Sequence, residues 1–390
     1  MDLTLFIKKS EDCMKFLLKI FLLIVALINV LVAAPISTSA KYAIIMDFDT
    51  ENILLDKSAK SRIYPASMSK LMTLYILFEQ ISEGAISFDS EFLVSKKAWK
   101  KGGSKMFVEV GSYVKVIDLL KGIIIQSGND ACIVVAEGIS GNEQAFADLM
   151  NVKAKELGLL NSNFKNSTGW PDKDHYMTPY DLALLSKKII DTFPSFLNMF
   201  KEKEFTFNNI KQGNRNPLLY SYKYSDGLKT GYTDESGFSL AATALKSGRR
   251  LITVLSGMDS VKERRDETIK LLEWGFREYV NVNLFEKNEA IIEVDVWLGN
   301  KAIIELITKE DINFTLRKKN INNYSASVVY NNPIAAPIKT NIQYGKLVIK
   351  NTFKGTLTYP LYAKQNINKA GIFKKISSAF SYFIFGGYAE

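Results

Sequence analysis

The sequence predicts an α+β domain followed by a smaller all-β domain. Within residues 41–284, β-prone runs stand at both ends of a stretch whose apolar residues recur at helical spacing. After residue 284 that spacing stops, and short β-rich runs alternate with Gly, Asn and Pro. A length of 390 residues with 47% hydrophobic and 23% charged side chains fits two domains and excludes a disordered chain.

The elements of the first domain are predicted in order along the chain. They are a hairpin at 42–55, helices near 67–83, 116–125, 130–137 and 143–157, an antiparallel meander over 226–258 and a helix at 263–279. Gly158 stands where a left-handed glycine closes a helix. Strands at both ends of the domain predict one sheet that joins its two ends.

The second domain is predicted as a small β-sandwich over residues 285–366. Its β-rich runs are 290–297, 302–307, 312–316, 327–330, 346–349 and 356–361. Residues 367–390 follow as a terminal amphipathic helix, because 371–385 place large apolar side chains on one face and lysines and serines largely on the other. We expect it to lie on a membrane surface, the alternative being a helix docked on the β domain.

The N-terminal 40 residues read as an export signal. An apolar run at 20–34 follows Lys15 and Lys19 and precedes small residues up to Ala40, after which we expect cleavage. The run is shorter than the roughly 20 apolar residues of a membrane span. Met14 is an alternative start, and an uncleaved signal anchor is the alternative to cleavage.

Scarcity of histidine and cysteine limits the possible chemistry. His175 is the one histidine, and Cys13 and Cys132 are the two cysteines, so a disulfide scaffold and the usual His/Cys zinc site are excluded. We expect no metal and no cofactor, a buried Cys132 and a structural His175. The net charge of +9 comes without a basic run interleaved with aromatics, so no nucleic-acid partner is expected.

Three short motifs occur in an informative order. Ser67 precedes Lys70 by one helical turn, which places hydroxyl and amine on one face for proton transfer. Ser127-Gly128-Asn129 stands between two apolar helices, and Lys229-Thr230-Gly231 begins the meander. Each motif is weak alone, since Ser112 and Ser162 also precede lysines at this spacing and Ser140-Gly141-Asn142 repeats the second motif.

Taken together, the trio resembles β-lactamases and penicillin-binding proteins. Longer strings resemble the D-alanyl-D-alanine carboxypeptidases, the low-molecular-mass penicillin-binding proteins of the penicillin-binding protein 5 type. These strings lie at 65–73, 127–131, 166–169, 175–178, 226–233 and 271–276. The resemblance spans about residues 41–390 and implies a β-lactamase/transpeptidase-like catalytic domain with an antiparallel sheet and a helical cluster, a C-terminal β domain and a membrane-anchor helix.

The same resemblance implies a role for each catalytic residue. Ser67 would be the acylated nucleophile, Lys70 its proton acceptor, and Ser127 a proton relay toward the leaving group. A lysine acts as a base near neutral pH only if its pKa is lowered, and burial together with the charge of Lys229 would do so.

Substrate-binding residues are implied in the same way. Asn129 would hold the substrate's peptide, and Lys229 and Thr230 would contact the substrate. Gly231 would allow close approach of the strand backbone, and the N–H groups of Ser67 and Tyr232 would form the oxyanion hole. Arg264 is expected to bind the terminal carboxylate, with Arg265 as the alternative.

The resemblance therefore implies a serine-type D-Ala-D-Ala carboxypeptidase. Its expected partners are the peptidoglycan stem pentapeptide, β-lactams as covalent inhibitors and the membrane surface, at the periplasmic face of the bacterial inner membrane. A DD-endopeptidase uses the same chemistry on cross-links and stays open. A class A β-lactamase needs a Glu-x-x-Leu-Asn loop, and the nearest string, residues 156–161, has one residue too many. A non-catalytic wall-binding protein is the remaining alternative.

Overall fold

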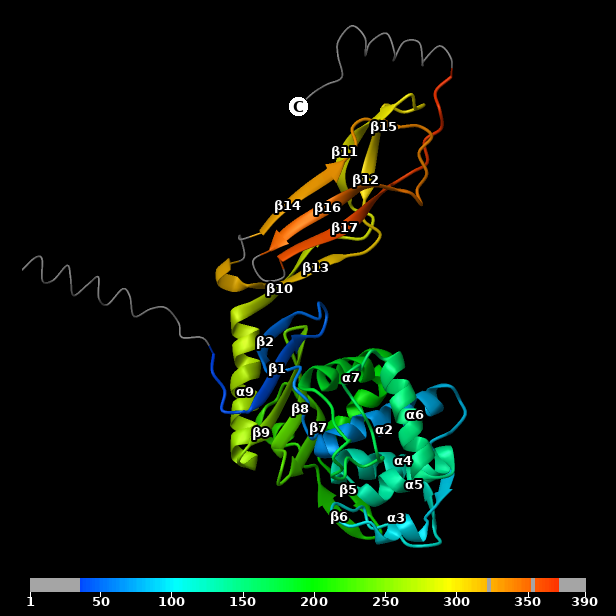
Figure 1. Cartoon of the computed structure of the whole chain (residues 1–390), viewed down its shortest axis with the longest axis vertical. Helices are drawn as coiled ribbons and strands as arrows, with labels where there is room; N and C mark the ends of the chain where they lie inside the picture. Colours follow the sequence, from blue (N-terminus) through cyan, green and yellow to red (C-terminus); the bar gives the residue numbers. More distant parts are fainter. Residues whose placement is uncertain (1–35, 321–323, 352–354, 372–390) are drawn as a thin grey trace, which may run out of the picture. The chain divides into compact units, whose positions relative to one another are not determined.

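A five-stranded antiparallel sheet forms the centre of the first domain (Figure 1). The computed structural model describes residues 36–320, 324–351 and 355–371. In sheet order, the strands are β2 Ile53–Lys57, β1 Tyr42–Asp47, β9 Arg249–Met258, β8 Gly237–Lys246 and β7 Ser225–Thr233. Because β1 pairs with β9, the sheet joins the two ends of the domain, as predicted. Strand β7, which carries Lys229, lies at the edge.

Both faces of this sheet are covered, which explains why its strands are apolar on both sides. Ile44 and Met46 of β1 belong to the core shared with the helical cluster. Ile45, between them, faces Gly275 of the long helix α9 (Val261–Glu278), where an added Cβ would lie 3.7 Å from its side chain. In Figure 1, α9 runs along one side of the sheet and the helical cluster lies on the other.

The helical cluster contains the predicted helices and others that the sequence analysis missed. Its elements are η2 Ala66–Ser69, α2 Lys70–Ser82, α3 Lys96–Lys100, α4 Val116–Lys121, η3 Gly122–Gln126, α5 Asn129–Ser140, α6 Glu143–Glu156, α7 Pro179–Thr192, η4 Pro194–Lys201 and α8 Leu218–Ser221. Two short hairpins complete the domain: β3 Glu91–Leu93 with β4 Tyr113–Lys115, and β5 Glu204–Phe207 with β6 Ile210–Gly213. Gly158 adopts the expected left-handed φ of 78° after α6.

Helix α7 is the largest element that the sequence analysis missed. It begins with a start signal that was available in the sequence: Thr178 Oγ1 accepts the N–H of Asp181 at 3.0 Å, with Pro179 at the first helical position. The sequence of α7 is therefore ordinary for a helix, and its capping residue would have allowed its start to be predicted.

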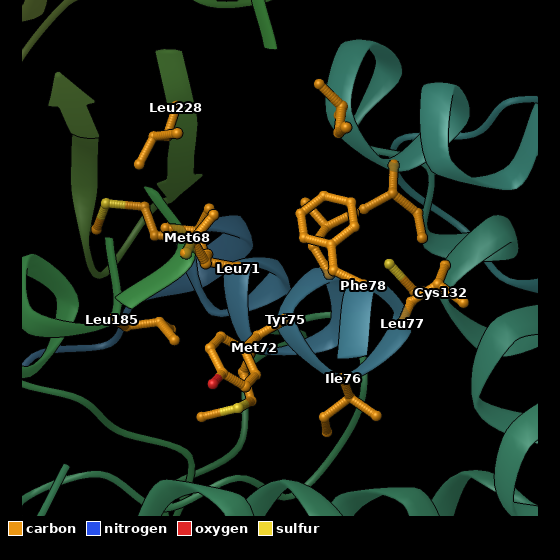
Figure 2. Packing of buried hydrophobic residues seen from close by; sticks show 14 of the residues in the cluster. Met68, Leu71, Met72, Tyr75, Ile76, Leu77, Phe78, Cys132, Leu185 and Leu228 are labelled. Atoms are coloured by element: carbon orange, nitrogen blue, oxygen red, sulfur yellow. The ribbon is translucent and has the colours of Figure 1, made fainter. Parts of the chain in front are cut away.

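Helix α2 runs through the centre of the core and is buried on nearly all sides. Figure 2 shows its side chains, among them Met72 and Phe78, reaching in several directions, with Cys132 of α5 and Leu185 of α7 beside them. Cys132 is a free, buried thiol, and burial raises its pKa to about 12. The predicted structural role of this cysteine is consistent with that position.

A β-rich domain follows α9, as predicted. Its strands are β10 Tyr279–Phe285, β11 Ala290–Trp297, β12 Ile303–Ile307, β13 Ile312–Arg317, β14 Tyr324–Tyr330, β15 Ile334–Ala335, β16 Gln343–Asn351 and β17 Gly355–Ala363, with a short turn η5 Lys318–Asn320. β10 pairs with β13, and the other strands form a six-stranded sheet of order β14-β16-β17-β12-β11-β15. Alternate residues such as Leu347 and Ile349 of β16 fill its core.

Both predicted boundaries of this domain fall within structured segments of it. Residue 284, taken as the boundary, lies inside β10. Residue 367, taken as the start of the terminal helix, is paired: Ile367 bridges Ile338, and the N–H of Ala370 donates to Leu298 O at 2.8 Å. The rest of the predicted anchor and most of the predicted signal lie outside the described residues. None of the helices that the structure describes combines the length and hydropathy of a membrane span.

Candidate active site

Ser67 and Lys70 meet where the short helix η2 leads into α2. Lys70 Nζ donates to Ser67 Oγ at 2.8 Å, to Asn129 Oδ1 at 2.8 Å and to the carbonyl of Thr168 at 2.6 Å. Lys70 is completely buried, whereas Ser67 is partly accessible. The predicted pairing of hydroxyl and amine is therefore present, with Asn129 as a third member.

The pKa of Lys70 is lowered to about 8, mainly because burial penalises its charged form. The positive charges of Arg215 and Lys101 lower it further. A lysine with this pKa is partly neutral near pH 7, so it can accept a proton from the hydroxyl beside it.

The predicted polar turn at Ser127 lies between η3 and α5. Ser127 is buried and takes a left-handed φ of 61°, which is unusual for serine, and its Oγ has no hydrogen-bond partner within the described residues. The turn is fixed by Asp130, whose buried carboxylate accepts the N–H groups of Met106 and Phe107, each at 2.9 Å. A buried carboxylate with such donors holds the segment at residues 104–108 against the turn.

Both polar atoms of the Asn129 side-chain amide form hydrogen bonds within the protein. Its Oδ1 accepts from Lys70, and its Nδ2 donates to Gly102 O at 2.9 Å. The side chain thus holds Lys70 in place. The predicted contact of Asn129 with the substrate's peptide remains a prediction.

Strand β7 brings the third motif beside Ser67. Gly231 lies so close to η2 that an added Cβ would stand 2.9 Å from Pro65 O and 3.3 Å from the Ala66 Cβ. The glycine is therefore required by the chain's own packing, in addition to any substrate approach that the sequence suggested. Within the described residues β7 pairs with β8 on one side only, so its outer edge can offer backbone groups to a bound peptide.

Lys229 and Thr230 precede this glycine and are buried. Burial places the pKa of Lys229 well below its usual value, and the charges of Lys70, Arg215 and Arg264 lower it further. The sequence analysis expected the charge of Lys229 to lower the pKa of Lys70. In the structure, the causes that lower the pKa of Lys70 are burial and the charges of Arg215 and Lys101, and it is the charge of Lys70 that lowers the pKa of Lys229.

The structure separates the two candidate arginines of α9. Arg264 is buried, and its Nη1 donates to Gly231 O and Ser239 O, each at 3.4 Å, so it faces the site strand. Arg265 is more exposed and pairs with neighbouring Asp266. Tyr232 also points outward and donates to Asp234 at 2.8 Å.

Arg215 is a site residue that the sequence analysis missed. It donates to Ser104 Oγ at 2.5 Å, and burial lowers its pKa. Its charge acts on both Lys70 and Lys229, although it belongs to none of the motifs and precedes Lys229 by 14 residues. No spacing rule links it to the motifs, because tertiary folding alone brings it near them.

A loop at residues 166–169 supplies the carbonyl that holds Lys70. Asn166 Oδ1 accepts the N–H groups of Thr168, Gly169 and Trp170 at 2.9 to 3.1 Å, which folds the loop on itself. Glu143 of α6 anchors it by accepting from Ser167 Oγ at 2.9 Å. The family-like string at 166–169 thus has a clear local function in positioning Lys70.

Gly169→Ala is expected to destabilise the protein by about 2–4 kcal/mol. Gly169 has a φ of 77°, and an added Cβ would overlap the carbonyl of Ala66 and Ser69 Oγ. Gly158→Ala is the matched control, because Gly158 has a φ of 78° with nothing within 4 Å of an added Cβ. Urea unfolding measures both, and equal losses would contradict the packing argument.

Two further predictions concern residues outside the group around Ser67 and Lys70, namely His175 and the string that begins at Glu156. His175 is buried, its Nδ1 accepts the N–H of Lys165 at 3.2 Å, and burial lowers its pKa to about 4. These contacts are consistent with the expected structural role. Glu156 is the last residue of α6, so the string at 156–161 begins at a helix end, and its carboxylate pairs with Lys153 at 2.7 Å.

Comparison with known proteins gives consistent matches over most of the chain. Residues 29–260 match the family model for D-alanyl-D-alanine carboxypeptidase, and residues 279–369 match that for the C-terminal domain of penicillin-binding protein 5. D-alanyl-D-alanine carboxypeptidase DacF of Bacillus subtilis is 36% identical over 343 residues, which cover 87% of this chain and 88% of the relative. DacC of Escherichia coli is 36% identical over 353 residues, which cover 88% of each chain.

Solved structures show the same likeness. Penicillin-binding protein 5 from Haemophilus influenzae superposes with a TM-score of 0.79 at 33% identity, covering 86% of this chain and all of that chain. Penicillin-binding protein D2 from Listeria monocytogenes, in its ampicillin-bound form, gives a TM-score of 0.57 at 29% identity, covering 62% of this chain and 99% of that chain.

Proposed function

The chain belongs to the D-alanyl-D-alanine carboxypeptidase family, and we propose that it removes the terminal D-alanine from peptidoglycan stem pentapeptides through an acyl-Ser67 intermediate. The observation that carries this proposal is the contact of 2.8 Å between Lys70 Nζ and Ser67 Oγ. The amine is buried and has a pKa lowered to about 8, so the pair has the geometry and the basicity of an activated serine.

In the acylation step, Lys70 takes the proton from Ser67 while the hydroxyl oxygen attacks the carbonyl of the penultimate D-alanine. Backbone N–H groups of Ser67 and Tyr232 would stabilise the oxyanion; removing one such donor typically costs about 2.7–4 kcal/mol. Ser127 would relay a proton to the departing D-alanine amine, and its buried, unpartnered Oγ within the described chain supports that role. Water then attacks the acyl ester, giving the tetrapeptide and restoring the Ser67 hydroxyl.

We assign binding of the substrate's terminal carboxylate to the cationic side chains beside the middle of β7. Lys229, Arg215 and Arg264 each carry a pKa lowered by burial, and their mutual repulsion favours an anion among them. Thr230 is placed next to Lys229 in the same strand. Arg264 is preferred over Arg265, because it faces Gly231.

Release of free D-alanine from a peptide ending in D-Ala-D-Ala tests the proposed function. Purified mature protein, without added metal, should release D-alanine and leave the shortened peptide. Cleavage of cross-linked dimers without release of D-alanine from the pentapeptide would instead identify a DD-endopeptidase. Absence of both activities would contradict the catalytic proposal.

We expect kcat/KM to rise with pH and to level off above about pH 8. Lys70 must be neutral to accept a proton, and its pKa is lowered to about 8, so the active fraction grows as pH increases through this value. Arg215→Gln should move the midpoint to higher pH, because the Arg215 charge lowers the pKa of Lys70. Arg277→Gln, at an exposed arginine of α9, is the control; an unchanged midpoint in both variants would contradict this assignment.

The proposal also includes export of the protein and its attachment to the membrane surface. The signal-like segment at 1–40 and the amphipathic segment at 371–385 support an enzyme at the periplasmic face of the inner membrane. Deleting residues 372–390 should move the protein from the membrane fraction to the soluble fraction without reducing peptide turnover. Retention in the membrane would point to an uncleaved signal anchor.

A further inference from the structure

A lysine-rich surface segment lies beside the candidate active site and has no part in the reaction steps described above. Residues 96–105 contain five lysines and no acidic residue. They form α3, which packs against α5 (Figure 1), and the loop that follows it. A run of like charges at the edge of a binding site attracts ligands of the opposite charge.

One face of α3 presents Lys96, Trp99 and Lys100 to solvent. Their spacing of three and four residues places them together on the helix surface. All three side chains are exposed, Trp99 to 42%. Neither lysine takes part in an ion pair within the described residues, so both charges are available to a ligand beside the aromatic ring.

The helix itself is held firmly, which fixes the positions of these three side chains. Ser95 Oγ accepts the N–H of Ala98 at 3.0 Å and caps the helix, and Ala98 is fully buried beneath it. Lys97 pairs with Glu143 of α6 at 2.7 Å. The helix therefore presents a surface whose backbone needs little ordering when a ligand binds.

The same segment reaches the candidate active site directly after α3. Lys100 is two residues from Gly102, so their Cα atoms are at most about 7.6 Å apart. Gly102 O accepts Asn129 Nδ2 at 2.9 Å, and Lys101 Nζ lies 4.1 Å from the centroid of the Trp170 ring. A large ligand held in the site can therefore extend onto α3.

Peptidoglycan has the chemistry that this surface fits. It is a sugar polymer with many stem peptides, and each stem ends in a carboxylate both before and after removal of D-alanine. Carboxylates pair with lysine ammonium groups. The C–H groups on one face of a sugar ring are apolar and fit the flat, apolar indole of Trp99.

We propose that Lys96, Trp99 and Lys100 form a second binding surface for the peptidoglycan polymer. A sugar ring packs on Trp99, and carboxylates of stem peptides other than the one being cleaved pair with the two lysines. Binding there raises the local concentration of stem peptides at Ser67. The inference rests on the proposed carboxypeptidase function and adds to it a preference for polymeric over short soluble substrates.

The test compares D-alanine release from dilute, pentapeptide-containing sacculi with release from the soluble peptide Nα,Nε-diacetyl-Lys-D-Ala-D-Ala. The double variant Lys96→Gln/Lys100→Gln should lower the rate on sacculi about two- to tenfold, the range of two exposed ion pairs. Its kcat/KM on the soluble peptide should stay unchanged. The loss should shrink in about 0.5 M NaCl, which screens exposed charges.

Trp99→Ala should lower the rate on sacculi about fivefold or more, as for a tryptophan at the centre of an interface. The matched control for the lysines is Lys346→Gln/Lys350→Gln, which makes the same charge change at two exposed lysines of β16 that have no ion pair in the described part of the chain. This control should keep the wild-type rate on both substrates.

Each other outcome contradicts the proposal in a defined way. Unchanged rates on sacculi in the α3 variants, or an equal loss in the β16 control, would overturn the second surface while leaving the carboxypeptidase proposal intact. Weaker binding of the α3 variants to phosphatidylglycerol vesicles, without a loss on sacculi, would assign the surface to a membrane instead. A wild type that releases no D-alanine from the soluble peptide would overturn the proposed function, and this inference with it.

Discussion

Replacement of Ser67 by alanine is expected to abolish both D-alanine release and covalent labelling by a fluorescent penicillin. The Ser67 Oγ is the proposed acyl acceptor, because it is the hydroxyl among the partners that the described residues give Lys70 Nζ. Loss of a nucleophile of this kind lowers kcat by at least about 10⁴-fold. Turnover assays and gel fluorescence after denaturation measure the two effects.

Ser112→Ala is the matched control for this variant. Ser112 also precedes a lysine, Lys115, by three residues, but its Oγ is exposed and donates to Glu109 O at 2.7 Å. This variant should keep wild-type turnover and labelling. Labelling that persists in Ser67→Ala would show that another residue is acylated, and a folded, inactive wild type would favour a non-catalytic wall-binding protein.

Lys70→Met is expected to lower the acylation rate by about 10²- to 10⁴-fold, the usual contribution of a general base. Methionine has similar length but accepts no proton from Ser67. The exchange removes a buried amine whose desolvation is unfavourable, but it also leaves Asn129 Oδ1 and the Thr168 carbonyl without their donor, so we expect the melting temperature to change by only a few degrees. Stopped-flow acylation by a chromogenic β-lactam and a thermal melt together measure activity and folding.

Lys115→Met is the corresponding control. Lys115 pairs with Asp89 at 2.9 Å, and both side chains are largely exposed, so its replacement should affect neither rate nor stability appreciably. A Lys70→Met variant that melts at a much lower temperature would indicate a structural role. One that keeps wild-type acylation would exclude Lys70 as the base.

Local sequence patterns predicted much of the fold, because helix periodicity and backbone conformation depend on residues that are close in the chain. Apolar spacing located α2 and α9, and Gly158 marked the end of α6 through its left-handed φ. The missed α7 carried a readable cap at Thr178. Short turns such as α3 and α8 were missed because a few residues carry too little periodicity to stand out.

The candidate site was predicted where a motif is contiguous, as at Ser67 with Lys70, since one helical turn brings such residues together. Its electrostatics could not be predicted in the same way. Arg215 acts on both motif lysines, and Glu143 anchors the loop whose Thr168 carbonyl holds Lys70. These contacts join residues far apart in the chain, and no local pattern encodes them.

By itself, the sequence determined the α+β class, the order of the elements, the three motifs and the resemblance that connects them. Only the tertiary structure decided that Asn129 turns toward Lys70, that Arg264 rather than Arg265 faces Gly231, and that the lysine-rich segment at 96–105 lies beside the site. The physical reason is the same in each case. Burial, charge interactions and the neighbours of a surface segment depend on distances between separate segments, which packing sets and sequence spacing does not.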